Sequence, residues 1–285
     1  MGFENYKIKG IEFSEVDGEL HCAIDQCGVK AIYPFPKTNY KPQAKYLLMD
    51  LDGTTVKSEE FWIWLIQRTV QELTNNPNFA FVAEDIPYIS GFSTIEHLDY
   101  CIQKYKLDAD VLTANNVYHR LAEYELNEIL EGRGNASAFH PREGLKEFLT
   151  EVKRRGIKIG LATSGLHYKA VPEILSTFRN LDMGDPVEFY DAIVTGGARK
   201  TGQYGTIGEM AVKPHPWVYA ELAMGLGVLD KSQVIVLEDS SSGLISGRLA
   251  GFDVIGFKDG NITASGTEEL TYAMVDTFEE VLKLL

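Results

Sequence analysis

Residues 46–56 read YLLMDLDGTTV, in which an apolar run passes directly into acidic and turn-forming residues. The run predicts a buried β-strand over residues 45–49, and the DG dipeptide that follows is typical of a turn. In an open parallel sheet, ligands bind beyond the carboxyl ends of the strands. Asp50, Asp52 and Gly53 are therefore candidates for a ligand site at the edge of a sheet.

The chain after Pro141 alternates between strand and helix patterns, which places the strand at 45–49 in a larger sheet. Alternation of this kind predicts an α/β fold with a doubly wound parallel sheet, and right-handed crossovers put helices on both of its faces. The expected strands are residues 157–163, 191–195, 234–238 and 253–257, and the expected helices lie near 145–152, 168–178, 214–226, 241–250 and 277–284.

Two other regions differ from this alternation. Residues 58–140 have helical periodicity throughout, with segments at 94–105 and 109–130. Residues 1–44 contain short β-leaning runs, broken by turn signals, and end in a proline-rich stretch that resembles a linker. We therefore expect three parts: a small β-rich N-terminal extension (1–44), an α/β core (45–57 and 141–285) and an all-helical insertion (58–140).

The composition is ordinary for a globular protein, with 45% hydrophobic and 24% charged residues. The formal net charge of −14 argues against a nucleic-acid partner, which requires a basic surface to displace phosphate counterions. No apolar run approaches the ~20 residues of a membrane helix, and the first residues lack a signal-peptide pattern. Cys22, Cys27 and Cys101 fit free thiols in a reducing compartment. We expect a cytoplasmic protein with no membrane partner.

Further polar residues follow other predicted strands. Thr163 and Ser164 follow the second strand, Glu238 and Asp239 follow a later one, and Lys213 precedes the helix between them. Together with the two aspartates, these carboxylates need a counter-charge, because like charges raise each other's pKa. Oxygen ligands that leave room for water and phosphate favour Mg²⁺. A hydroxyl, helix N–H groups and a lysine add an anion cradle, so the pattern predicts a phosphoryl site.

Asp50 and Asp52 lie two positions apart on an extended segment, so we expect their side chains to point the same way. This arrangement suits a nucleophile and a separate general acid/base. Each element also has an ordinary structural interpretation: a DG turn, a helix N-cap at Thr163, and an acidic helix start after the strand at 234–238. We expect Trp62 to contribute to packing rather than to stacking on a substrate.

Four segments, in order, resemble the motifs of the haloacid dehalogenase-like phosphotransferase superfamily: YLLMDLDGTTV (46–56), IGLATSG (159–165), VKPHP (212–216) and VIVLEDSSSG (234–243). The resemblance implies a Rossmann-like core and a phosphoryl-transfer reaction. The site residues that it implies are Asp50 as nucleophile, Asp52 as acid/base, Thr163 and Lys213 as phosphate ligands with Ser164 and Gly53 beside them, and Asp50, the Asp52 carbonyl, Glu238 and Asp239 as Mg²⁺ ligands.

The branch of the superfamily that this chain resembles is the β-phosphoglucomutase-like one, whose helical cap of the C1 type follows the first motif, as residues 58–140 do here. Dehalogenases lack the second aspartate, and phosphonatases carry alanine there and use a cap lysine, so Asp52 disfavours both. The mutase's cap histidine and arginine would fall near Trp62 and Thr94 and are absent, and Lys57 replaces an acid.

The expected function is therefore a Mg²⁺-dependent phosphatase that acts on a small phosphorylated metabolite through an aspartyl-phosphate. A phosphosugar mutase and a non-catalytic phosphate-binding or regulatory protein are the alternatives. The extension at 1–44 and the glycine-rich loop at 196–209 are additions that could shape the substrate pocket or an interface. The sequence identifies neither the substrate nor the oligomeric state.

Overall fold

The computed structural model describes residues 6, 8, 10–26, 29–89, 93–135, 137–197 and 213–285. A six-stranded parallel sheet forms its centre, in the order β11-β10-β9-β4-β7-β8. The sheet reverses its order at β4, because later strands add first on its β7 side and then on its β9 side. Such a switch point is where open α/β sheets bind ligands. The strands are β4 (Tyr46–Asp50), β7 (Lys158–Ala162), β8 (Ala192–Val194), β9 (Val234–Glu238), β10 (Asp253–Phe257) and β11 (Ala273–Val275).

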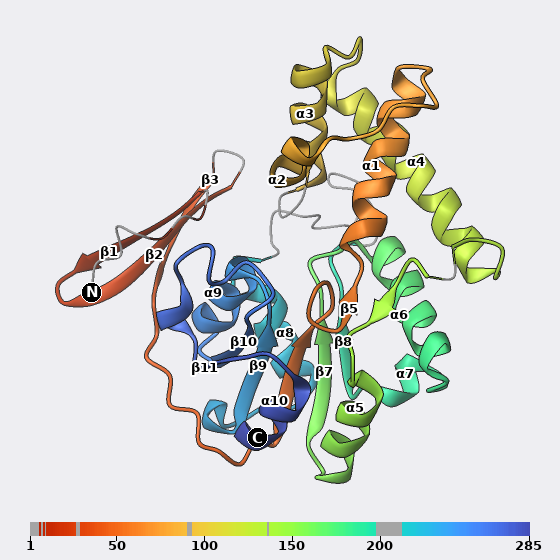
Figure 1. Cartoon of the computed structure of the whole chain (residues 1–285). Coiled ribbons are helices and arrows are strands. Elements are labelled where there is room, and N and C mark those ends of the chain that lie inside the picture. The colour runs from red at the N-terminus through yellow and green to blue at the C-terminus, as the bar shows by residue number, and fades with distance from the viewer. Residues whose placement is uncertain are drawn as a thin grey trace.

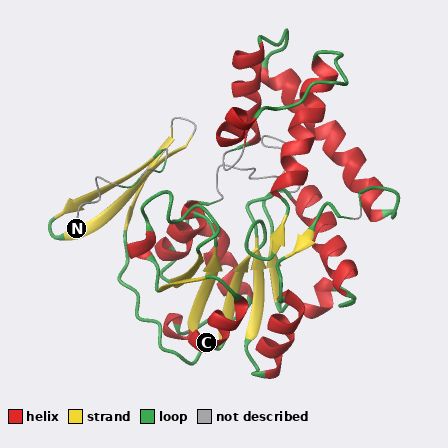
Figure 2. Cartoon of the chain, in the orientation of Figure 1, coloured by secondary structure: helices red, strands yellow, loops and turns green. Residues whose placement is uncertain are grey.

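The predicted α/β fold is confirmed, with helices against both faces of the sheet (Figure 2). Alternate residues of β4 point to opposite faces: Leu47 and Met49 join one hydrophobic cluster, and Leu48 joins the other. The first cluster includes Phe148 and Phe278, and the second is built largely on the helix that follows Pro216. The helices of the core are α5 (Leu145–Arg154), α6 (His167–Leu181), α7 (Pro186–Phe189), α8 (Trp217–Gly225), α9 (Ser241–Leu249) and α10 (Phe278–Leu284).

The helix expected from Pro214 begins only at Trp217, since residues that precede a proline, as His215 does, are disfavoured in the helical region. The sequence also did not predict β11, α7 or the short 3₁₀ helices η2 (Ala83–Asp85), η4 (Lys231–Gln233) and η5 (Glu268–Leu270). Within the part of the chain that the structure describes, no helix is both long and apolar enough to cross a membrane.

The helices α1 to α4 stand beyond the carboxyl ends of the sheet strands (Figure 1). Side-chain hydrogen bonds cap the N-termini of two of these helices. Ser93 and Glu96 form a capping box at the start of α3, and the Asp110 carboxylate accepts from the N–H of Thr113 at the start of α4. Helix α4 packs on both α1 and α6. The bounds are α1 (Glu59–Leu73), α2 (Ile86–Ile89), α3 (Thr94–Tyr105) and α4 (Val111–Leu130).

Two short strands carry the chain between the sheet and these helices. β5 (Val56–Lys57) leads into α1, and β6 (His140–Pro141) leads back toward α5. They pair with each other as an antiparallel ribbon, with Val56 opposite Pro141 and Lys57 opposite His140. The two segments that connect the sheet with these helices therefore lie side by side.

The N-terminal region forms a separate three-stranded antiparallel sheet of β1 (Ile11–Val16), β2 (Glu19–Gln26) and β3 (Val29–Pro34). It lies beside α9, where Ile11 and Ile24 pack with Ile245 (Figure 1). The sequence predicted β structure here but not the third strand, because its residues merge into the proline-rich stretch.

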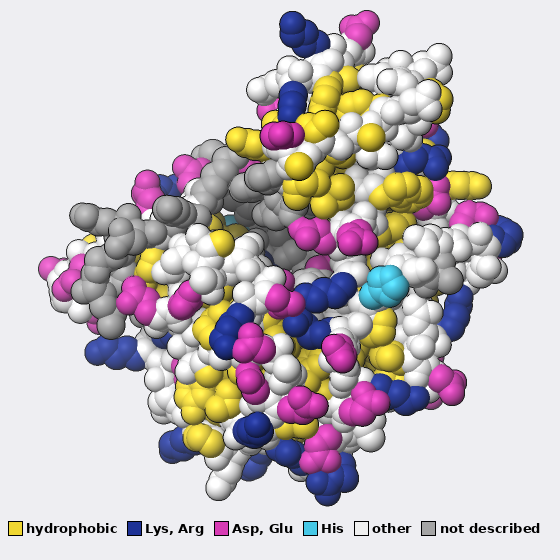
Figure 3. Space-filling view, in the orientation of Figure 1, with side chains coloured by type: hydrophobic (Ala, Val, Ile, Leu, Met, Phe, Trp, Pro, Cys, Tyr) yellow, Lys and Arg dark blue, Asp and Glu magenta, His cyan; other side chains and the backbone are white. Residues whose placement is uncertain are grey.

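Cys22 and Cys101 are buried free thiols. Cys27 and residues 198–209 of the predicted loop lie outside the described residues. On the face shown in Figure 3, acidic and basic side chains are interspersed, so the net charge of −14 is not gathered into one patch there.

Candidate active site

Asp50 is the last residue of β4, at the switch point of the sheet, and its side chain is 7% exposed. One carboxylate oxygen, Oδ1, accepts a hydrogen bond from the Lys213 ammonium. The other, Oδ2, is buried and has no hydrogen-bond partner among the described residues. Burial and the charge of Glu238 raise the pKa of Asp50, and Lys213 opposes that rise. A buried oxygen without a partner is costly, and it marks a position that a ligand or ion can satisfy.

Glu238 and Asp239 follow β9 and complete an acidic cluster with Asp50, whose ligand oxygens lie within 4.8 Å of one another. Glu238 already accepts several hydrogen bonds: from Lys213 Nζ (2.6 Å) and the Tyr219 hydroxyl (2.7 Å) on one oxygen, and from Ser240 on the other. Asp239 accepts one from Thr54 Oγ1 at 3.1 Å. Burial and the charge of Glu238 raise the pKa of Asp239 to about 7. Asp50 and Asp239 therefore have more free acceptor capacity than Glu238.

Lys213 is the cation that the structure places inside this cluster. Its side chain is 5% exposed, and its Nζ lies between Asp50 and Glu238 and 4.9 Å from the centre of the Tyr219 ring. Burial lowers the pKa of Lys213, but the charges of Asp50 and Glu238 outweigh this effect and raise it. The ammonium thus stays charged beside the buried carboxylates.

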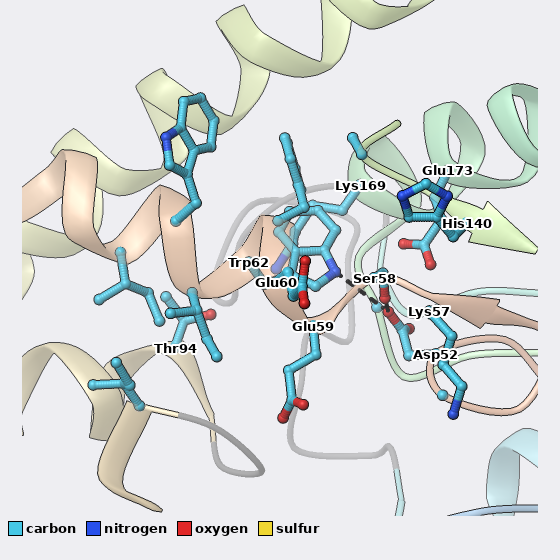
Figure 4. Close-up of a pocket in the computed structure, with 18 of the residues that line it drawn as sticks. Asp52, Lys57, Ser58, Glu59, Glu60, Trp62, Thr94, His140, Lys169 and Glu173 are labelled. Carbon is cyan, nitrogen blue, oxygen red and sulfur yellow. Dashed lines mark hydrogen bonds between the residues drawn. The ribbon is translucent and has the colours of Figure 1, made fainter. Parts of the chain in front are cut away.

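Asp52 lies outside the strand, and its carboxylate is held by three donors. Ser58 Oγ (2.7 Å) and Trp62 Nε1 (3.3 Å) donate to Oδ1 (Figure 4). Thr163 Oγ1 donates to Oδ2 at 3.1 Å. The Asp50 carboxylate is instead paired with Lys213, which is not among the partners that these bonds give Asp52. Their carboxylates therefore occupy two different environments.

Trp62 has a contact in addition to the expected packing. Its ring packs on Phe61 and Phe139, as expected, but its N–H reaches Asp52 and its side chain lines the cavity. The indole therefore links the helix α1 to the acid/base candidate. The sequence pattern did not predict this contact, because Trp62 lies on the apolar face of a helix, where packing is the usual role.

The turn after β7 lies against the same site. Thr163 Oγ1 accepts a hydrogen bond from the N–H of Gly165 at 2.8 Å, and Ser164 Oγ accepts one from the backbone N–H of Lys213 at 3.2 Å. The helix α6 begins two residues later, at His167. All the sequence-predicted site residues are thus brought to one edge of the sheet, although Asp52 is not part of the acidic cluster.

Arg142 was missed by the sequence analysis, since nothing in the local sequence HPREG distinguishes it from a surface arginine. Its guanidinium donates to the carbonyl oxygens of Gly53 (2.6 Å) and Thr54 (3.0 Å), and it pairs with Asp259 at 2.9 Å. It lies over the Phe257 ring, 3.7 Å from its centre. Arg142 therefore fixes the turn that carries Asp52.

We expect Arg142→Met to lower the free energy of unfolding by about 2–3 kcal/mol, because two buried carbonyl groups lose a charged donor. The matched control is Lys57→Met, which also removes a partner of Asp259 but at a side chain that is 43% exposed. That pair is expected to contribute less than about 1 kcal/mol. Urea unfolding of both variants measures the difference, and equal losses would show that Arg142 acts only through its surface ion pair.

A cavity of about 950 Å³ lies between the sheet edge and helices α1 to α3. Asp52, Lys57 and Lys169 line it from the core, and Trp62 lines it from α1 (Figure 4). His97, on α3, also lines it. Lys169 Nζ lies 4.2 Å from the centre of the Trp62 ring. The cavity is large enough for a small organic phosphate.

Glu173, on α6, is a second residue that the sequence analysis missed. It is buried, lines the cavity, and its Oε1 has no hydrogen-bond partner among the described residues. Burial and the nearby charge of Asp52 raise the pKa of Glu173 well above its usual range. Glu173 lies one helical turn after Lys169, so the two side chains share a face of α6. This spacing is the one feature of the sequence that relates Glu173 to a residue of the cavity.

The site thus combines the switch point of a doubly wound parallel sheet, an acidic cluster with a buried lysine, and a helical insertion beyond the strand ends. The sequence profile of haloacid dehalogenase-like hydrolases matches residues 47–257. The chain belongs to this family and is a hydrolase of its superfamily.

Relatives and structural neighbours fit this assignment. Phosphonoacetaldehyde hydrolase of Bacillus cereus is 25% identical over 78% of this chain and 79% of its own length. The structure of CbbY from Rhodobacter sphaeroides, a mutant in complex with xylulose-1,5-bisphosphate, superposes with a TM-score of 0.63 at 20% identity, covering 83% of this chain and 96% of that one. A predicted phosphoglycolate phosphatase from Haemophilus somnus gives 0.63 at 18% identity, covering 85% and 97%. At these identities the structural likeness establishes the fold.

Proposed function

We propose that the protein is a Mg²⁺-dependent phosphomonoesterase that acts on a small organic phosphate. The observation that carries the proposal is the different settings of the two aspartates. Asp50 lies in the buried cluster, and its Oδ2 has no partner among the described residues, whereas Asp52 is held at the cavity by Ser58 and Trp62. A nucleophile and a general acid/base need such different environments.

The residues present fit a divalent cation. The candidate ligands are carboxylate oxygens: the buried Asp50 Oδ2 has no hydrogen-bond partner within the described part of the chain, and Asp239 keeps free acceptor capacity. Asp50, Asp239 and the Asp52 carbonyl would hold Mg²⁺, with Glu238 beside them. Bound Mg²⁺ would offset the negative charge of the phosphate and of the cluster.

In the proposed reaction, an Asp50 oxygen attacks phosphorus and the bond to the leaving oxygen breaks. Asp52 gives its proton to that oxygen, so the alcohol departs and an aspartyl-phosphate remains. Asp52 then takes a proton from water, which attacks phosphorus, releases inorganic phosphate and restores Asp50. Lys213 and the turn of Thr163, Ser164 and Gly165 would hold the phosphate oxygens. Residues 58–140 would act as the cap that excludes bulk water.

Hydrolysis of phosphonoacetaldehyde is the competing activity, since a relative with that name is 25% identical to this chain over 78% of its length. Two features count against it. Asp52 occupies the position where the resemblance places alanine in phosphonatases. Among the described residues that line the cavity, the lysines are Lys57, which precedes α1, and Lys169 on α6, so neither comes from α1 to α4. The same lining lacks an arginine, which favours hydrolysis over a mutase reaction.

Turnover of p-nitrophenyl phosphate and a panel of sugar phosphates, phosphoglycolate and phosphonoacetaldehyde tests the proposal. We expect ester hydrolysis with Mg²⁺ and a loss of at least about 100-fold with EDTA, because removal of the cation leaves the phosphate facing uncompensated carboxylates. Mg²⁺ should also raise the melting temperature, by about 2–4 °C for each kcal/mol of binding. Asp239→Asn should abolish that rise. Turnover that survives EDTA, or cleavage of the phosphonate alone, would contradict the proposal.

A further inference from the structure

The N-terminal sheet reaches the loop that carries Lys213. Tyr33, on β3, places its hydroxyl 2.8 Å from Nδ1 of His215. The Tyr33 ring also meets the His215 ring and the Trp217 ring edge-on, with centroid separations of 5.8 and 6.3 Å. The extension is therefore in direct contact with His215, two residues after the buried lysine, and with Trp217, the first residue of α8.

This loop has few backbone anchors of its own. Pro214 and Pro216 have no N–H group to donate. Among the described residues, the side chains that hold the loop are Ser164, which accepts from the Lys213 N–H at 3.2 Å, and Ser246, which donates to the His215 carbonyl at 2.6 Å. The Tyr33–His215 bond adds a contact from outside the core, and it is the one that fixes the His215 side chain.

We propose that the N-terminal sheet is a positioning element of the active site, in which Tyr33 acts through His215 to hold Lys213 between Asp50 and Glu238. The expected effect on turnover rests on the proposed function, whereas the expected effect on the loop does not. The position of the Lys213 ammonium is sensitive to its loop, because the side chain is 5% exposed and contacts both carboxylates at once. Tyr33 is a positioning residue and touches no reacting atom.

Other contacts already attach the N-terminal extension to the core. Ile11 and Ile24 pack with Ile245, and the segment after β3 is tied to Asp253 by the Thr38 hydroxyl (2.5 Å) and the Tyr40 N–H (2.7 Å). Attachment of the sheet therefore does not depend on the Tyr33 hydroxyl, so its loss can change the loop without releasing the sheet.

The test compares Tyr33→Phe with Tyr6→Phe. Both variants remove one hydroxyl from the N-terminal region, but Tyr6 bonds to Glu269 at 2.5 Å, away from Lys213. We expect Tyr33→Phe to lower kcat about fivefold, the effect of one lost hydrogen bond, with KM nearly unchanged. Hydrogen–deuterium exchange in peptides that cover residues 213–219 should be faster by about the same factor. Tyr6→Phe should change neither quantity.

Exchange is measured on the wild-type protein and both variants whether or not they turn over substrate. Wild-type protein without phosphatase activity would refute the proposed function, and the exchange comparison would still decide the role of Tyr33. Unchanged exchange in Tyr33→Phe, or an equal change in Tyr6→Phe, would overturn the inference while leaving the phosphatase assignment intact.

Discussion

Asp50→Asn is expected to lower kcat for phosphomonoesters by at least about four orders of magnitude, since an amide cannot replace the attacking carboxylate. The substitution keeps the shape of the side chain and removes one charge from a crowded cluster. Burial already raises the pKa of Asp50, which means that its charged form is disfavoured in the folded protein. The melting temperature of the variant should therefore be equal to or above that of the wild type. Steady-state kinetics and thermal unfolding measure the two quantities.

Asp276→Asn is the matched control, because Asp276 directly follows β11 in the same sheet but is 57% exposed and paired with Lys258. Its activity should equal that of the wild type. Intact-protein mass spectrometry on quenched reactions should detect a phosphorylated wild-type chain and no phosphorylated Asp50→Asn chain. An Asp50→Asn protein with a tenth of wild-type activity would refute the nucleophile assignment.

Lys213→Met is expected to have the second largest effect, on both activity and stability. The methionine would leave Asp50 and Glu238 buried without the ammonium that now pairs with each. Removal of one member of a buried ion pair costs about 3–5 kcal/mol, and loss of a charge aimed at the phosphate costs about 10²–10³ in kcat. Urea unfolding in metal-free buffer and phosphatase kinetics measure these changes.

Mg²⁺ should restore part of the lost stability of Lys213→Met, since the cation supplies the missing positive charge. Lys258→Met serves as the control: its ion pair with Asp276 is 49% and 57% exposed and is expected to contribute less than about 1 kcal/mol. A Lys213→Met protein with wild-type kcat would show that the ammonium only neutralises the cluster and does not act on substrate.

The sequence predicted the parallel sheet well, because its strands are apolar runs bounded by turn residues. The strands at 234–238 and 253–257 match β9 and β10 at both ends. It failed for short elements that depend on tertiary contacts. β5 and β6 have two residues each and form only because they meet. The antiparallel strand β3 ends at Pro34, where the proline signal suggested a linker instead.

For the site, the sequence predicted the residue types at the strand ends but not their mutual geometry. The Asp52 carboxylate is held by Ser58, Trp62 and Thr163, and spacing alone does not contain that information. Arg142, directly after β6, and Glu173, on α6, join the site through contacts between segments far apart in the chain. Whether an arginine or glutamate is buried depends on such packing, so no local motif marks either residue.

The β5–β6 ribbon has a consequence for folding. Neighbouring strands β4 and β7 are separated in the chain by the whole helical insertion, and pairing across such a loop carries an entropic cost that grows with its length. Once Val56 meets Pro141, that loop is closed, and only the stretch that contains α5 still separates the two strands. With the ribbon formed, the pairing of β4 with β7 is therefore nearly local, although the two strands are far apart in the chain.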